Sequence, residues 1–146
     1  MSQYSDLLTA AQSVTMALPG FAGLDSAIRS RPFCSTEHGD TLPFVCFSPG
    51  LESVGDENFD RGVRMWYPIL VTIFREKGPA YEDAAAIVWK LDRREEVRSA
   101  LWEPRVLADS QIDCTYDPRP PWDFSALDKV FDVSTQLFTF ANDEER

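Results

Sequence analysis

The chain has 146 residues, and 24 acidic against 14 basic side chains give it a formal net charge of −10. This length favours one domain over residues 1–146, and 44% apolar with 12% aromatic residues argue against intrinsic disorder. The acidic balance argues against nucleic-acid binding through phosphates and against docking on an anionic membrane. Composition therefore indicates an acidic globular domain without indicating its function.

An amphipathic helix is predicted near the N-terminus, where Pro19 and Gly20 stop it. A cap residue and a first-turn acid precede apolar residues at helical spacing: Ser5 and Asp6, then Leu7, Ala11, Val14 and Leu18. A signal peptide requires positively charged residues before its apolar segment, and no Lys or Arg lies upstream here. The most apolar run, Met65–Phe74, is about half as long as a membrane helix. We expect neither an export signal nor a membrane span.

A connector is predicted over residues 20–41, with at most a helical turn over Ala27–Arg31. A short strand follows over Leu42–Ser48, with apolar residues on both faces. Residues Leu51–Gly62 then form an acidic loop that is longer than a hairpin connection needs. This loop leads into the strongest strand pattern of the chain.

That strongest predicted strand covers Val63–Arg75 and has two apolar faces. Tyr67, Ile69, Val71 and Ile73 alternate onto one face, and Trp66, Leu70, Thr72 and Phe74 onto the other. We expect a helix of the chain to cover one face, and a second sheet or a neighbouring subunit to cover the other. Pro68 has no N–H to donate, which predicts a sheet edge or a bulge there.

A second helix is predicted after Gly78 and Pro79, which break the strand. Its expected buried stripe consists of Ala84, Ile87, Val88 and Leu91. Asp92 and Glu95 have the spacing of a capping box, so the helix is expected to kink or restart there before Pro104 ends it.

Two further strands close the predicted domain. Ile112–Asp117 alternates apolar and polar residues as a half-buried strand does. The proline-rich connector Asp117–Trp122 and a helical turn over Phe124–Lys129 lead to the last strand, Val130–Ala141. In that strand Phe131, Val133 and Leu137 lie on one face and Phe138 and Phe140 on the other, which predicts a bulge or a face covered on assembly.

The predicted element order is helix, strand, strand, helix, strand, strand (α-β-β-α-β-β). This order is typical of an α+β domain built from two layers. We therefore expect a mainly antiparallel four-stranded sheet with the helices packed on one face.

Motifs that carry metal or cofactor chemistry have little support. Cys34, His38 and Cys46 could be three metal ligands, but a structural zinc site takes four. The three cysteines, Cys34, Cys46 and Cys114, form no CxxC pair, which favours a reducing compartment over a disulfide framework. Asp56–Gly62 resembles the start of a calcium loop but lacks its glycine and its bidentate glutamate. No phosphate-binding or dinucleotide motif is present, so no metal and no cofactor is expected.

Paired carboxylates are the one feature that would suit acid–base catalysis. Asp92, Glu95 and Glu96 could share such work if a pocket shifted one pKa. Three arginines lie at helical spacing beside them, namely Arg93, Arg94 and Arg98, so surface ion pairs explain the acids more simply. No catalytic residue is predicted.

Three segments together resemble a known family. They are the run Trp66–Phe74, the alanine-rich start of the second helix (Ala84–Ala86) and the closing run Phe131–Phe138. In these segments and in element order, the chain is similar to tail-terminator (tail-completion) proteins of long-tailed bacteriophages and related head–tail joining proteins. The resemblance implies a small α+β subunit without enzymatic activity. The resemblance further implies that copies of the subunit form a ring, expected to be a hexamer, that caps the tail tube and meets the head connector. The virion that contains this ring is assembled in the host cytoplasm.

Two groups of residues are predicted to serve such a ring. Contacts with neighbouring copies or partners are assigned to aromatic and proline side chains, namely Trp66, Pro68, Trp122, Phe138 and Phe140. The lumen is assigned to the acidic loop residues Glu52, Asp56, Glu57 and Asp60. An acidic lumen repels DNA, which then passes without specific binding.

Two other classes of function stay open from the residues alone. One is a monomeric or dimeric acidic adaptor, for example an inhibitor that imitates DNA; the oligomeric state separates it from a ring. The other is a small hydrolase or metal-binding protein that uses Asp92, Glu95 and Glu96 or Cys34, His38 and Cys46, which metal analysis tests.

Overall fold

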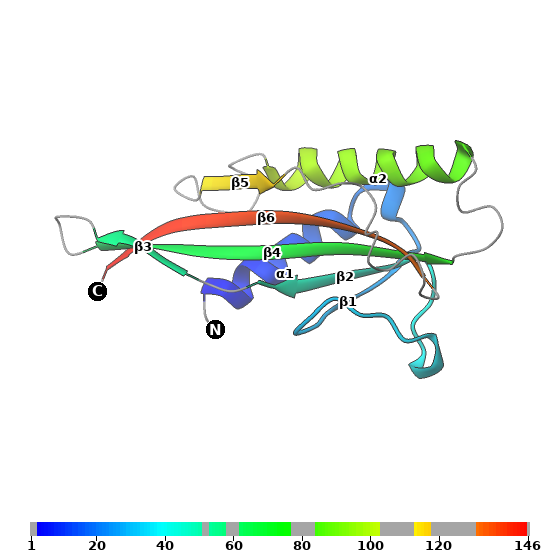
Figure 1. Cartoon of the computed structure of the whole chain (residues 1–146), viewed down its shortest axis with the longest axis horizontal. Helices are drawn as coiled ribbons and strands as arrows, with labels where there is room; N and C mark the ends of the chain where they lie inside the picture. Colours follow the sequence, from blue (N-terminus) through cyan, green and yellow to red (C-terminus); the bar gives the residue numbers. More distant parts are fainter. Residues whose placement is uncertain are drawn as a thin grey trace.

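The computed structural model describes residues 3–50, 53–57, 62–76, 84–102, 113–117 and 131–145. Two helices and six strands follow one another in the order α1 (Gln3–Met16), β1 (Asp25–Ile28), β2 (Phe44–Pro49), β3 (Ser53–Glu57), β4 (Gly62–Glu76), α2 (Ala84–Trp102), β5 (Asp113–Asp117) and β6 (Phe131–Glu145) (Figure 1). Short 3-10 helices cover Pro19–Phe21 and Thr36–His38. The predicted α+β class is confirmed.

The sheet has more strands than predicted and is mixed. Its order is β1-β2-β4-β6-β5, and β3 pairs with β4 beyond the end of β2. All pairs are antiparallel except β1 with β2, which run parallel. The predicted helical turn over Ala27–Arg31 is therefore wrong: β1 includes Ala27 and Ile28, and residues 29–31 form no helix. The predicted loop Leu51–Gly62 contains β3.

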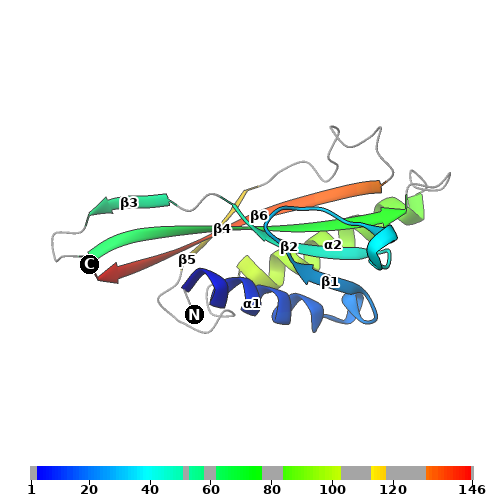
Figure 2. The same cartoon turned by 90° about the horizontal axis from the view of Figure 1, so that it is seen from below.

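Both helices lie on the same face of the sheet, as predicted (Figure 2). Leu7, Leu8 and Ala11 of α1 and Val97 and Leu101 of α2 share one core with the strands. From β2, β4 and β6 that core receives Val45, Phe47, Tyr67, Ile69, Val71, Ile73, Phe138 and Phe140. The N-terminal helix is confirmed, but it already begins at Gln3, so Ser5 lies within it instead of capping it.

The second face of the sheet is covered in part by the chain itself. Phe44, Cys46 and Phe74 form a separate buried cluster there, and partly buried side chains from the connector and β6 pack on it: Ala27, Cys34, Leu42, Phe131 and Val133. Trp66, Pro68 and Leu70, farther along the same face of β4, are half-buried. The two-sided alternation predicted for β4 is therefore confirmed.

Pro68 lies in a central strand and not at a sheet edge. Its carbonyl accepts the N–H of Gly50 at 2.9 Å, and the hydroxyl of Tyr4 approaches both this carbonyl and that of Gly50. In register, β2 ends opposite Ile69 and β3 begins opposite Trp66. The N–H that proline lacks therefore falls in the gap between two partner strands, where no ladder bond is lost.

Gly50 packs so closely on Pro68 that a side chain has no room. A Cβ at Gly50 would lie 2.9 Å from Cγ of Pro68 and 3.0 Å from its Cβ, and the ring cannot rotate away. We expect Gly50→Ala to lower the free energy of unfolding by about 1–3 kcal/mol, as overpacking does. Urea unfolding measures the change.

Gly20→Ala is the matched control for this substitution. A Cβ there would meet only the ends of the Arg93 and Glu96 side chains, which can swing away. Its cost should therefore be smaller than that of Gly50→Ala. Equal costs would contradict the tight packing at Pro68.

Helix α2 turns a different face to the sheet than predicted. It is one continuous helix, without a restart at Asp92. Its buried residues are Lys90, Arg94, Val97 and Leu101, whereas Val88 is 54% and Leu91 41% exposed. The predicted stripe is wrong because the strand beneath α2 presents buried polar residues. Asp132 and Ser134 accept hydrogen bonds from the side chains of Lys90 and Arg94, and Gln136 donates to the backbone carbonyl of Arg94.

Strand β6 contains no bulge against β4. The register runs unbroken from Gly62↔Glu145 to Glu76↔Phe131. Asp132, Ser134 and Gln136 lie on the helix-covered face together with Phe138 and Phe140, while Phe131 and Val133 lie on the opposite face, so the apparent switch of faces is a regular alternation. The predicted pattern of β5 is confirmed: Cys114 and Tyr116 pack against the core, and Thr115 is exposed.

Candidate interaction surfaces

The aromatic residues predicted to form contacts separate into three groups. Phe138 and Phe140 are 0% and 2% exposed in the chain's own core, beneath the helices, so they form no contact surface, which corrects the prediction. Trp66 and Pro68 are half-buried on the opposite face of the sheet. Trp122 lies outside the described residues, as do residues 118–121 of its connector, the predicted turn at 124–129 and Pro104.

One end of the sheet extends beyond both helices and is rich in acidic residues. It consists of β3 and the adjoining ends of β4 and β6 (Figures 1 and 2). Its strands contain Asp56, Glu57, Asp143, Glu144 and Glu145, against the single basic residue Arg64. We call this region the acidic end. Of the residues predicted for the lumen, Asp56 and Glu57 lie in it, and Glu52 and Asp60 lie outside the described residues.

A buried polar network joins α2 to the strands beneath it. Lys90 pairs with Asp132. Arg94 donates to the hydroxyl of Ser134 at 2.8 Å and to the carbonyl of Thr135 at 3.0 Å. The amide of Gln136 donates to the carbonyl of Arg94 at 2.9 Å and to the hydroxyl of Tyr116 at 3.2 Å.

Burial dominates the electrostatics of this network. It lowers the pKa of Lys90, although the hydrogen bond with Asp132 opposes that effect, and it lowers the pKa of Arg94. Lys90 is 1% and Asp132 5% exposed. Because these groups are so deeply buried, they fix the position of the helix and are not accessible to a ligand.

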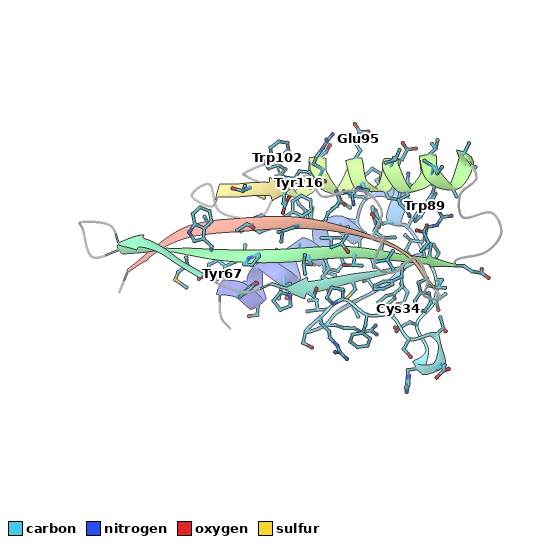
Figure 3. All side chains as sticks on the ribbon, viewed as in Figure 1. Cys34, Tyr67, Trp89, Glu95, Trp102 and Tyr116 are labelled. Carbon is cyan, nitrogen blue, oxygen red and sulfur yellow. The ribbon has the colours of Figure 1, made fainter. Side chains whose placement is uncertain are left out.

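The outward face of α2 carries a row of exposed side chains at alternating spacings of four and three residues. The row consists of Ala84, Val88, Leu91, Glu95, Arg98 and Trp102, and we call it the outer seam. Glu95 and Trp102 point away from the sheet in Figure 3, although the Trp102 ring also contacts that of Tyr116, with centroids 5.8 Å apart. Val88, Leu91 and Trp102 are 41–54% exposed.

The connector between β1 and β2 is held down by an ion pair. Arg29 donates two hydrogen bonds to Asp40, at 2.6 and 2.7 Å, and the backbone N–H of Ser35 donates a third at 2.8 Å. The guanidinium lies 4.6 Å from the ring centroid of Phe44. The hydrogen bonds from Arg29 and Ser35 lower the pKa of Asp40 from 3.8 to about 2.

This shift predicts a pH-dependent effect of Asp40→Asn. A carboxyl whose pKa is lower in the folded state stabilises the fold above its unfolded pKa, and this contribution disappears as the pH falls towards the folded pKa. We expect the variant to be less stable than the wild type at neutral pH, with the difference shrinking between pH 3.8 and about 2. Urea unfolding over that range measures it, and a pH-independent difference would contradict it.

Cys34, His38 and Cys46, the residues of the alternative metal-binding hypothesis, differ in burial and in their partners. Cys46 is buried and its Sγ lies 3.7 Å from the carbonyl of Arg31, whereas His38 is exposed and contacts Ser35 at 2.6 Å. Within the described ranges, no group of three or more His, Cys, Asp or Glu side chains could hold a metal. Burial raises the pKa of Cys34 to about 11 and that of Cys114 to about 12, so both thiols are protonated at neutral pH.

The acids of α2 line an open groove of about 650 Å³ beside the end of α1. Arg93 pairs with Glu96 at 2.6 Å, and Arg98 with Glu95 at 3.9 Å, as the predicted surface ion pairs require. Arg94, grouped with them in the prediction, is instead buried beneath the helix. The groove thus contains paired charges.

Comparisons with known proteins add no family. No family model matches the chain, and no curated protein does. Neither of the two described helices has the length and apolar character needed to cross a membrane.

Proposed function

We propose that this chain is a structural virion protein of a long-tailed bacteriophage. Its copies form a ring, a hexamer by the family resemblance, at the head–tail junction. The ring caps the tail tube, joins it to the connector in the neck and leaves a lumen for DNA. In this proposal the subunit has no catalytic role.

The acidic end of the sheet is the observation that supports the proposal. It extends beyond the helices, and its three strands contain five acidic residues against one basic residue. In a ring with these ends turned inward, the lumen presents like charges to the DNA phosphates, so duplex DNA passes without being held. Trp66, Pro68 and Leu70, on the face of the sheet opposite the helices, are half-buried in one copy and suit a contact with the next.

Mass and shape of the purified full chain test the proposal. Native mass spectrometry and electron microscopy should show a closed ring with a channel wide enough for duplex DNA. A map of the ring should place Asp56 and Glu57 on the channel wall. The genes that flank this one should encode portal, adaptor or tail-tube proteins.

Two results would overturn the proposal, and a third would overturn only its lumen assignment. If the chain stays monomeric or dimeric at high concentration and does not bind tail tubes, it forms no ring. If this monomer or dimer binds a basic protein instead, it is an acidic adaptor. A ring whose acidic ends lie on its outer wall removes the lumen assignment.

A further inference from the structure

Both faces of helix α2 mix charged and apolar residues. Its inward face contains the buried cations Lys90 and Arg94 besides Val97 and Leu101, while Val88, Leu91 and Trp102 are exposed on the outward face. Exposed apolar residues scattered singly are ordinary, but these recur in one row of the outer seam. Such a row on a helix is what a partner helix covers.

The spacing of the outer seam suits a second helix. Steps of four, three, four, three and four residues separate its six members, from Ala84 to Trp102, and all six are exposed. This is the repeat of a coiled-coil seam, which packs against another helix inclined at a small angle.

The charges in the middle of the outer seam specify the partner's identity and direction. Glu95 and Arg98 occupy two successive seam positions and are 69% and 44% exposed. In an antiparallel pair of two α2 helices related by a twofold axis between these positions, Glu95 of each copy faces Arg98 of the other. The same register places Leu91 opposite Trp102, so the contact consists of the four seam residues from Leu91 to Trp102, and Ala84 and Val88 lie outside it. A parallel pair would place Glu95 against Glu95 and Arg98 against Arg98, which repel each other.

We propose that two copies of this chain associate through their outer seams as an antiparallel helix pair. The contact is isologous, so each copy supplies both halves of every interaction. This contact is separate from the contacts that close a ring. If the chain forms rings, the contact joins two rings; if it forms no ring, the contact produces a dimer.

Sedimentation velocity over a range of concentrations tests the pairing, with the full chain and charge-reversed variants. We expect Leu91→Glu to weaken association by about 30-fold or more, because it places a carboxylate against an indole. Thr9→Glu, an equal change of charge at an exposed position of α1, is the matched control and should leave association unchanged. Circular dichroism and urea unfolding of each variant show that the fold is kept.

A charge-swap cycle makes the test specific for the antiparallel pair. Glu95→Arg and Arg98→Glu should each weaken association by about tenfold, because like charges then face each other, and the double variant should restore it. The proposal is overturned by a wild type that does not pair, by Leu91→Glu pairing as the wild type does, or by a double variant that does not recover. If the wild type forms paired rings and Leu91→Glu forms single rings, both the proposed function and the helix pairing are supported. If the chain forms a dimer that depends on the outer seam but forms no ring, only the helix pairing is supported.

Discussion

Lys90→Met is expected to lower the free energy of unfolding by about 3–5 kcal/mol, because it leaves a carboxylate buried without its cation. Asp132 is 5% exposed, and Lys90 is the cation that pairs with it. The second oxygen of Asp132 has no hydrogen-bond partner among the residues that the structure describes. The substitution therefore removes the principal compensation for burying that charge. Urea unfolding at neutral pH measures the loss.

Two controls separate the buried charge from the loss of a side chain. The double variant Lys90→Met, Asp132→Leu replaces the whole pair by apolar groups, so it should recover most of the lost stability or exceed the wild type. Arg98→Met removes one partner of the exposed pair with Glu95 and should cost at most about 1 kcal/mol. A double variant as unstable as Lys90→Met would show that the pair matters through its shape and not through its charge.

The same ion pair explains why the orientation of α2 could not be predicted. Helical periodicity identifies where apolar residues recur, and the predicted stripe of Ala84, Ile87, Val88 and Leu91 assumes that such a row faces the core. Lys90 and Arg94 are buried because Asp132 and Ser134 lie beneath them, and these residues are about forty positions away in the sequence. Tertiary pairing of this kind overrides the local pattern.

The strands that could be predicted from the sequence are the long ones, in which apolar residues alternate clearly between the two faces. β4 and β6 contain fifteen residues each, and their core segments alternate clearly enough to be found from the sequence. β1 has only four residues and pairs in parallel with β2, and β3 contains a glycine and two acids, which are rare in strands. Both short strands form because a stronger neighbouring strand offers a free ladder, which no local pattern indicates.

The second large effect is expected for Phe138→Ala, which should lower the free energy of unfolding by about 3–5 kcal/mol. Phe138 is 0% exposed, pairs with Ile69 across the β4–β6 ladder and stacks on Tyr116, with ring centroids 5.0 Å apart. Removing its ring opens a cavity among residues of one chain. The loss should therefore be independent of protein concentration.

Leu137→Ala is the matched control, because its side chain lies on the opposite face of the same strand and is only half-buried. It should cost clearly less than Phe138→Ala in dilute solution, where sedimentation shows single chains. The sequence pattern of β6 is equally compatible with a second arrangement, in which Phe138 faces a neighbouring subunit instead of the chain's own core. In that case Phe138→Ala would leave the single chain as stable as the wild type and weaken only its association, so the concentration dependence of unfolding distinguishes a core residue from a contact residue.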